Sequence, residues 1–261
     1  MTSPCVSVVM SVYNNATTVG YAVDSILAQS FSDFELIVID DGSKDGSGKV
    51  LADRADRDPR VIVVSQENAG LTRALIRGCE LARGRYIARQ DADDWSHAER
   101  LFEQVAVLNA QPEVGFVSCW SECCGPRGEL VDVIMWPAGS DDATNLFRSK
   151  PGGLIHGSVM FRRELYEEVG SYRSEFFFAQ DCDLWMRLIE HSSVAFVQRA
   201  LYVFRSFGPR DISGSHGSQQ NQFFGLGLAC RHARLQNGSD KQILNDVRKL
   251  KECVLKGSSN S

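Results

Sequence analysis

The sequence of 261 residues lacks the features that would place it in several large protein classes. No apolar run reaches the roughly 20 residues that a helix needs to cross a bilayer. Residues 1–15 contain no basic stretch ahead of an apolar one, so we expect no signal peptide. The net charge is −5 and the pI is about 5.6, which excludes the basic field of non-specific nucleic-acid binders. We therefore expect a cytoplasmic protein with no nucleic-acid partner.

The cysteines are too sparse for a disulfide scaffold and wrongly spaced for zinc. The chain has eight of them. The cluster of Cys119, Cys123 and Cys124 contains no Cys-x-x-Cys pair, and no second pair completes a zinc knuckle. We interpret four of the cysteines as small apolar side chains in a reduced protein. This interpretation applies to Cys5, Cys79, Cys119 and Cys182.

The turn after the first apolar run contains no glycine. Residues 11–17 read Ser-Val-Tyr-Asn-Asn-Ala-Thr, whereas a dinucleotide-binding turn needs Gly-x-Gly-x-x-Gly so that the backbone can approach the pyrophosphate. A P-loop is absent too. A nicotinamide-dependent dehydrogenase is therefore disfavoured.

Short apolar runs alternate with helical patterns in the first part of the chain. Runs rich in β-branched residues are typical of parallel strands that are buried on both faces. Apolar residues at helical spacing lie between these runs. The alternation predicts an α/β fold with a Rossmann-like, mostly parallel sheet. The predicted strands cover residues 6–12, 36–39, 61–64 and 86–88, and the predicted helices cover 19–27, 47–55 and 71–82.

The rhythm changes beyond about residue 112. There the pattern predicts a mixed half without regular parallel units, then a Gly/Ser-rich loop over residues 206–218 and two helices within 223–255, broken at 237–239. The predicted strands of this half cover 114–117, 130–135, 158–161, 194–197 and 201–204, and its helices cover 141–148, 162–169 and a segment around 184–189.

Acidic residues follow the fourth predicted strand, where residues 91–94 read Asp-Ala-Asp-Asp. Ligands of doubly wound sheets bind beyond the carboxyl ends of the strands. Carboxylates that meet there repel each other unless a cation lies among them, and hard oxygen ligands suit Mn²⁺ or Mg²⁺. Helix capping near residue 96 is the alternative for Asp91 and Asp94, but it does not account for Asp91 and Asp93 together.

Several ordered motifs now point to one family. Residues 5–213 resemble a family 2 inverting glycosyltransferase with the GT-A fold, a single domain. The resemblance implies a nucleotide-sugar-binding half (1–112), an acceptor-binding half (113–215) and a C-terminal helical extension (216–261). The motifs are SVVMSVYNNATTVGYAVDSILAQSFSDFELIVIDDGSKDGS, ENAGLTRAL, ARGRYIARQDADDWSHAERL, HGSVMFRREL and VGSYRSEFFFAQDCDLWMRL.

The resemblance assigns the nucleotide to residues of the first half. Ser11, Tyr13 and Asp41 resemble the residues that hold uracil and ribose, and the Tyr13 ring is offered to the base. Asp40 is expected to anchor its turn. Arg73 is a candidate for a base or phosphate contact, with a solvated helix residue as the alternative.

The metal and the catalytic base are assigned in the same way. Asp91 and Asp93 match the family's Asp-x-Asp motif: Asp91 is placed at the nucleotide, and Asp93 is the expected ligand of Mn²⁺ or Mg²⁺. Asp181 matches the acid of the family's Glu-Asp pair and is implied to be the general base, with a helix cap as the alternative. Gln180 stands where the family usually has Glu, so it can position an acceptor but cannot share the base role. Asp183 is expected to be a surface or capping carboxylate.

Sugar contacts are assigned to fewer residues. Trp95, beside the Asp-x-Asp motif, is the predicted sugar platform, whereas Trp185 is expected in the core. His156 is expected either to contact the acceptor or donor or to be a structural histidine. Phe207 occupies the place of a family histidine; His216 could substitute for it, or could be a solvated loop residue.

The resemblance implies a metal-dependent enzyme that transfers a sugar, with inversion, from a nucleotide-sugar such as a UDP-sugar to a hydroxyl of a glycan or lipid-linked acceptor in cell-surface polysaccharide assembly. One rival is a non-catalytic sugar-nucleotide-binding protein, and another is a nucleotidyltransferase. The basic residues of 231–256 predict either peripheral contact with an anionic membrane or a solvated helix pair.

Overall fold

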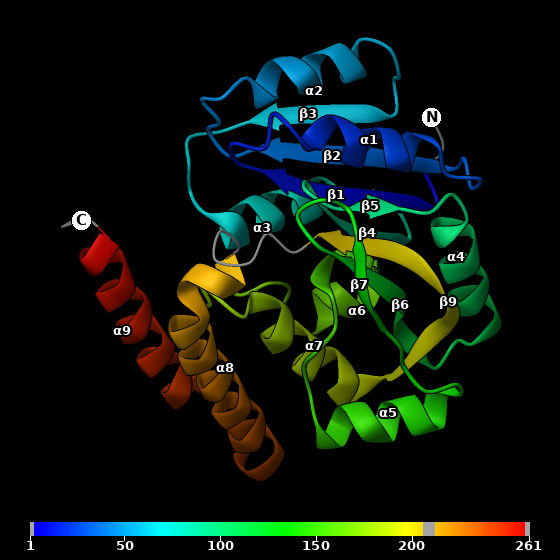
Figure 1. The fold of residues 1–261 in the computed structure, drawn as a ribbon. Coiled ribbons are helices and arrows are strands. Elements are labelled where there is room, and N and C mark those ends of the chain that lie inside the picture. Colours follow the sequence, from blue (N-terminus) through cyan, green and yellow to red (C-terminus); the bar gives the residue numbers. More distant parts are fainter. Residues whose placement is uncertain (1–2, 206–211, 259–261) are drawn as a thin grey trace.

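A parallel sheet forms the centre of the molecule, as the sequence predicts. The computed structural model describes residues 3–205 and 212–258. Within them, four parallel strands lie side by side in the order β3-β2-β1-β4. Their apolar runs are buried because helices cover both faces (Figure 1). These strands are β1 (Val6–Val12), β2 (Phe34–Asp40), β3 (Val61–Ser65) and β4 (Tyr86–Asp91).

The helices divide between two cores, one on each face of the sheet. Successive side chains of β1 point to opposite faces, so Val8 and Met10 enter one core and Val9 enters the other. One face is covered by α1 (Val19–Leu27), α2 (Ser47–Ala55) and α4 (Arg100–Ala110). The other is covered by α3 (Leu71–Leu81), α5 (Ser140–Ser149), α6 (Arg163–Glu168) and α7 (Gln180–His191).

The second half extends the same sheet with mixed strands. β8 pairs antiparallel with both β4 and β6, and β6 pairs parallel with β9. The short β5 and the hairpin strand β7 are antiparallel to β9 and β6. One sheet therefore runs through both predicted halves. The added strands are β5 (Trp95–Ser96), β6 (Val114–Cys124), β7 (Leu130–Ile134), β8 (Met160–Arg162) and β9 (Ser193–Arg205).

The expectation of two separate strands in 194–204 is wrong, because β9 is one continuous strand. Its pairing with β6 skips two residues: Val197 lies opposite Cys119, and Ala200 lies opposite the next residue of β6. Gln198 and Arg199 bulge outward there and are exposed. A polar pair at a bulge resembles a strand end in the sequence.

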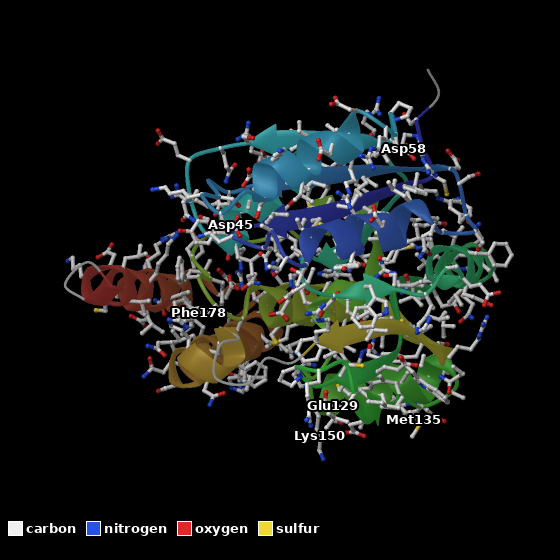
Figure 2. All side chains as sticks on the ribbon, turned by 45° about the horizontal axis from the view of Figure 1, so that its top comes forward. Asp45, Asp58, Glu129, Met135, Lys150 and Phe178 are labelled. Carbon is white, nitrogen blue, oxygen red and sulfur yellow. The ribbon has the colours of Figure 1, made fainter. Side chains whose placement is uncertain are left out.

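The C-terminal helix α8 (Ile212–Asn237) packs against α7, and α9 (Lys241–Ser258) packs against α8 on the side away from α7 (Figure 1). The predicted break at 237–239 is confirmed. The predicted loop over 206–218 is wrong from residue 212 onward, where the chain is helical, and residues 206–211 lie outside the described residues. Tertiary packing outweighs the helix-breaking Gly/Ser composition, because Phe223 of α8 enters a small core with Phe176 and Phe178. Figure 2 labels Phe178 of this core.

The basic residues of α9 are largely engaged within the molecule. Arg248 pairs with Glu175 and Lys249 with Asp246, while Lys251 donates to a backbone carbonyl. No helix in the described ranges is long and apolar enough to cross a membrane. Peripheral membrane contact stays a prediction.

Candidate active site

The carboxyl ends of the central strands are level, which brings the predicted site residues to one edge. Ser11 of β1 lies opposite Asp91 of β4, and the following residue of β1 lies opposite Asp40 of β2. Ser11 is half-buried and Asp91 is partly exposed. The edge therefore carries the polar groups in the order that the sequence predicts.

Two loops at this edge are tied together and present Tyr13. The side-chain oxygen of Asn14 accepts the backbone N–H of Lys44 at 2.8 Å, and Asp45 accepts the N–H of Ala16 at 2.9 Å (Figure 2). Burial would raise the pKa of Asp45, but hydrogen bonds from Ser47 and Ala16 hold it below its ordinary value. The Tyr13 ring is 50% exposed on this fixed support, so it is free to meet a ligand.

Asp41 fixes the loop that precedes α3. Its carboxylate is 2% exposed and accepts Gln66 Nε2 at 2.6 Å and the backbone N–H groups of Ala69 and Gly70, each at 2.9 Å. Asp40 anchors its own turn by accepting the N–H of Ser43 at 3.0 Å. Nucleotide binding by Asp41 stays a prediction, and its contacts give it a loop-shaping role as well.

Arg73 is exposed on α3, near this loop. It borders a hollow of about 530 Å³ together with Gln66, Arg77 and Ser174. Burial and then the charge of Arg73 lower the pKa of Lys251 from α9. Arg73 therefore brings positive charge close to the loop that Asp41 shapes, in keeping with the predicted phosphate or base contact.

Asp94 is not a helix cap, contrary to one of the expectations. Helix α4 begins later, at Arg100, and Asp94 is 2% exposed. Its two carboxylate oxygens accept the hydroxyl of Tyr202 and the N–H of Arg205, each at 2.8 Å. Burial, then the charges of Asp91 and Asp93, raise the pKa of Asp94 well above its ordinary value. Three carboxyl groups are thus concentrated beyond β4.

Gly157 of the His-Gly-Ser motif makes this arrangement sterically feasible. A Cβ at this position would collide with the Tyr202 hydroxyl and would lie 2.9 Å from Oδ2 of Asp91. The missing side chain lets both groups lie against the backbone. The motif therefore serves packing at the acidic turn.

Asp181 lies in the first turn of α7, after a residue with unusual backbone geometry. Ala179 has φ 53° and ψ 28°, in the left-handed region that costs a non-glycine residue about 1–2 kcal/mol. Burial raises the pKa of Asp181, and the charge of Asp91 raises it further. The two carboxyl groups therefore lie within electrostatic reach of each other. Gln180, beside Asp181, is buried.

Asp183 is neither a surface nor a capping carboxylate, so the prediction from the sequence is wrong. It is 1% exposed and pairs with Arg173 and Arg187. Arg173 also reaches Asp240, 2.7 Å away at the start of α9. Arg187 follows Asp183 by one turn on α7, but Arg173 comes from the loop before α7, a tertiary contact that helical spacing does not reveal.

A buried arginine connects the acidic turn to the rest of the site. Arg89 of β4 donates to Asp91 Oδ1 at 2.7 Å and through Nε to His156 Nε2 at 3.2 Å. The same nitrogen of His156 lies 2.7 Å from the hydroxyl of Tyr172. Sequence reasoning missed Arg89, Tyr172 and Tyr202. Arg89 directly follows the predicted strand 86–88 and lies inside the longer strand β4, so its only signal was a charged residue at the end of an apolar run.

The aromatic predictions have different outcomes. Trp185 is buried and stacks on Phe116, with ring centroids 5.8 Å apart, so its predicted core position is confirmed. Trp95 is half-buried, and the guanidinium of Arg205 lies 5.8 Å from its ring centroid. His216 is exposed at a kink within α8, where its backbone has φ −127° and ψ 23°, and its ring lies 5.2 Å from that of Phe178. Phe207 lies outside the described residues.

The acidic turn has the donor set for a divalent cation that is shared with a ligand. In the described part of the chain, no three His, Cys, Asp or Glu residues come together as a metal cage. Mg²⁺ in nucleotide sites is usually held by one or two carboxylates together with phosphates and water. The half-buried Asp93 and the partly exposed Asp91 fit that pattern. The cysteines are all free thiols.

This fold and this edge of carboxylates define a glycosyltransferase of the GT-A type. Residues 7–170 match the model of the glycosyl transferase family 2, and the chain belongs to that family.

Two relatives come from Bacillus subtilis (strain 168), and their names assign them to the glycosyltransferases. EpsE is 33% identical over 210 residues, which cover 77% of this chain and 73% of EpsE. EpsH is 39% identical over 267 residues, which cover 95% of this chain and 73% of EpsH.

Solved structures of the same fold support the architecture. S. aureus TarS 1-349 in complex with UDP has a TM-score of 0.70 and 18% identity, over 93% of this chain and 70% of TarS 1-349. The mannosyltransferase PcManGT from Pyrobaculum calidifontis, in complex with GDP-Man and Mn²⁺, has a TM-score of 0.64 and 24% identity, over 96% of this chain and 70% of PcManGT.

Proposed function

We propose that this glycosyltransferase moves a sugar from a UDP-sugar to a hydroxyl group of a glycan or lipid-linked acceptor, with inversion at the anomeric carbon. The observation that carries the proposal is the level strand edge, where Ser11 lies opposite Asp91 and Tyr202 fixes the buried Asp94 of the acidic turn. Asp181 of α7 lies near enough to this edge for the charge of Asp91 to raise its pKa. The complexes of TarS with UDP and with UDP-GlcNAc support the choice of UDP.

On the donor side, the exposed Tyr13 would cover the base and the level strand ends would hold the diphosphate. Asp93, with Asp91, would hold Mn²⁺ or Mg²⁺, as the Mn²⁺ in PcManGT supports. Such a cation offsets the charge that develops on the departing diphosphate. Arg205, over the Trp95 ring, would bring further positive charge to the same side.

On the acceptor side, Asp181 would act as the general base. It accepts the proton of the acceptor hydroxyl while that oxygen attacks the anomeric carbon from the face opposite the leaving group. A carboxylate whose pKa is raised by burial is a stronger base than an exposed one. The neutral amide of Gln180 would orient the acceptor and take no part in proton transfer.

The experiment that tests the proposal measures nucleotide release. The chain is incubated with UDP-glucose, UDP-GlcNAc, UDP-galactose or GDP-mannose, Mn²⁺ and candidate acceptors, and released UDP or GDP is quantified. Asp181→Asn should lower kcat by about 10²–10⁴-fold and keep UDP binding in calorimetry. The matched control is Asp142→Asn, an exposed residue on α5 that should behave as wild type.

Two outcomes would overturn the proposal. Transfer that is unchanged in Asp181→Asn would remove the base. UDP-sugar binding without turnover of any donor would favour the non-catalytic sugar-nucleotide-binding protein, and pyrophosphate release from a nucleoside triphosphate would favour the nucleotidyltransferase.

A further inference from the structure

His156 lies at the junction of the two elements that carry the proposed reaction. Its Nε2 contacts Arg89, which belongs to β4 and holds Asp91. Its ring meets the ring of Trp185 edge-on at 5.8 Å. Trp185 follows Asp181 by one turn on α7, so both lie on the same face of this helix. A single imidazole thus touches the donor-side strand and the acceptor-side helix.

The Arg89 end of this junction is rigid. The guanidinium is fully buried and donates through Nη2 to Asp91, through Nε to His156 and through Nη1 to the backbone carbonyls of Val9 and Gln90. Every nitrogen of the guanidinium has a partner. It therefore cannot turn away from His156 without disturbing its contact with Asp91.

The hydrogen-bond chemistry fixes the tautomer of His156. A guanidinium has donors only, so Nε2 of His156 must accept. An imidazole that accepts at Nε2 is neutral and carries its proton on Nδ1. The hydroxyl of Tyr172, 2.7 Å away, then donates to the same lone pair of Nε2, which Arg89 and Tyr172 share in a three-centre contact. Burial and the charge of Arg89 also lower the pKa of His156 well below its ordinary value, in agreement with a neutral ring.

We propose that His156 is a positioning residue of the transfer reaction. By accepting hydrogen bonds from Arg89 and Tyr172 on Nε2, it keeps Asp91 and the helix that carries Asp181 in fixed relative positions. This inference rests on the proposed function, because it needs donor-side and acceptor-side carboxylates that act together. A displacement of about 1 Å between reacting groups costs about a hundredfold in rate. The contact with Nε2 is therefore worth more to kcat than to donor binding.

A pair of amide substitutions separates this role from a direct sugar contact. Glutamine carries its amide about as far from the backbone as Nε2, whereas asparagine reaches only to the position of Nδ1. We expect His156→Asn to lower kcat by about a hundredfold. His156→Gln, whose amide oxygen can accept from Arg89 and Tyr172, should lower kcat by less than about tenfold. The KM for the donor should change little in either variant.

Two kinetic results would overturn the proposal. Equal losses of kcat in both variants would mean that Nε2 does not matter. A better-preserved Asn variant would mean that Nδ1 contacts a substrate and that His156 acts as a sugar-binding residue.

A second measurement does not depend on turnover. Imidazole ¹⁵N NMR of the full chain should find His156 as the neutral Nδ1–H tautomer, with Nε2 unprotonated. A proton on Nε2 would overturn the proposal whether or not a donor has been found. If the Nδ1–H tautomer is present and the wild-type chain transfers no sugar, the proposed function fails and not the hydrogen-bond assignment, so the two failures are distinguishable.

Discussion

The hydroxyl of Tyr202 donates to the carboxylate of Asp94 at 2.8 Å, although the two residues are 108 positions apart in the chain. The same hydroxyl accepts the backbone N–H of Asp91 at 3.3 Å. Strand β9, the last strand along the chain, thus determines the shape of the acidic turn beyond β4. A residue of the predicted acceptor half therefore supports the turn that carries the proposed metal site.

Removing this hydroxyl should destabilise the protein. Tyr202→Phe leaves the buried Asp94 carboxylate with one donor fewer, and we expect the free energy of unfolding to fall by about 1–3 kcal/mol. Urea denaturation at neutral pH measures the change. The control is Tyr21→Phe, at a residue that is 70% exposed, with an expected change within about 0.5 kcal/mol. Equal stability of the two variants would contradict a stabilising contact between Tyr202 and Asp94.

A methyl group added at position 157 should lower the stability of the protein, whereas one added to α8 should raise it. Gly157→Ala forces the Tyr202 hydroxyl and the Asp91 carboxylate aside, at an expected cost of about 1–3 kcal/mol. Gly225→Ala adds a methyl group in open space on a helix and should gain up to about 1 kcal/mol. Thermal unfolding followed by circular dichroism compares them. A Gly157 variant as stable as wild type would show that the turn adapts.

The left-handed backbone at Ala179 predicts an unusual response to glycine. Ala179→Gly relieves the strain that precedes Asp181, so the free energy of unfolding should rise or stay within about 0.5 kcal/mol. Ala229→Gly, within α8, should instead lose about 1 kcal/mol. Chemical denaturation of both variants gives the comparison. A loss at 179 as large as that at 229 would argue against the strain.

The proposed ligand role of Asp93 predicts that UDP and Mn²⁺ bind together. Calorimetry should find tighter UDP binding when Mn²⁺ is present, and Asp93→Ala should abolish that gain, because the ion loses a carboxylate that it shares with phosphates. Asp141→Ala, on the exposed side of α5, is the control and should keep the gain. An undiminished gain in the Asp93 variant would refute the assignment.

Acid should weaken the attachment of α9. Burial would raise the pKa of Asp240, but its bonds with Arg173 and Arg234 hold that pKa below its ordinary value. A carboxyl whose pKa is lowered by folding contributes stability that is present above its unfolded pKa and lost as the pH falls through its folded pKa. Stability should therefore decline below about pH 4.

Asp240→Asn tests this directly, because the amide does not titrate. The variant should be less stable at neutral pH, and its stability should decline less steeply with acid. Urea denaturation across the acidic range measures both, with the exposed Asp246→Asn as control. A decline in Asp240→Asn that is as steep as in wild type would assign the acid sensitivity to other carboxyl groups.

The sequence predicted the central strands because their cause is local. A run such as Val6–Val12 is apolar whatever lies around it, and a strand buried on both faces needs nothing else. The arrangement of Ser11 and Asp91 at one edge followed from the parallel order of those strands. The mixed strands of the second half were harder to predict, because the bulge at Gln198 resembles a strand end.

The errors at the site have a common physical cause. Helix capping was an expected role for Asp183 and the alternative for Asp94, because capping is the local explanation for an acid near a helix start. Their true partners, Tyr202 and Arg173, come from elements whose approach no spacing rule gives. Arg89 was missed for the same reason, because its role at the site depends on a contact with His156, which lies in a motif far along the chain.

The sharing of Arg173 between Asp183 and Asp240 limits how this enzyme can be recombined with its relatives. A chimera that receives foreign terminal helices inherits the largely buried guanidinium of Arg173 next to α7 and must supply a new anion for it. Crossover points after α7 are therefore expected to produce insoluble hybrids. Exchange of the whole segment from the loop before α7 to the end of α9 keeps the charges matched.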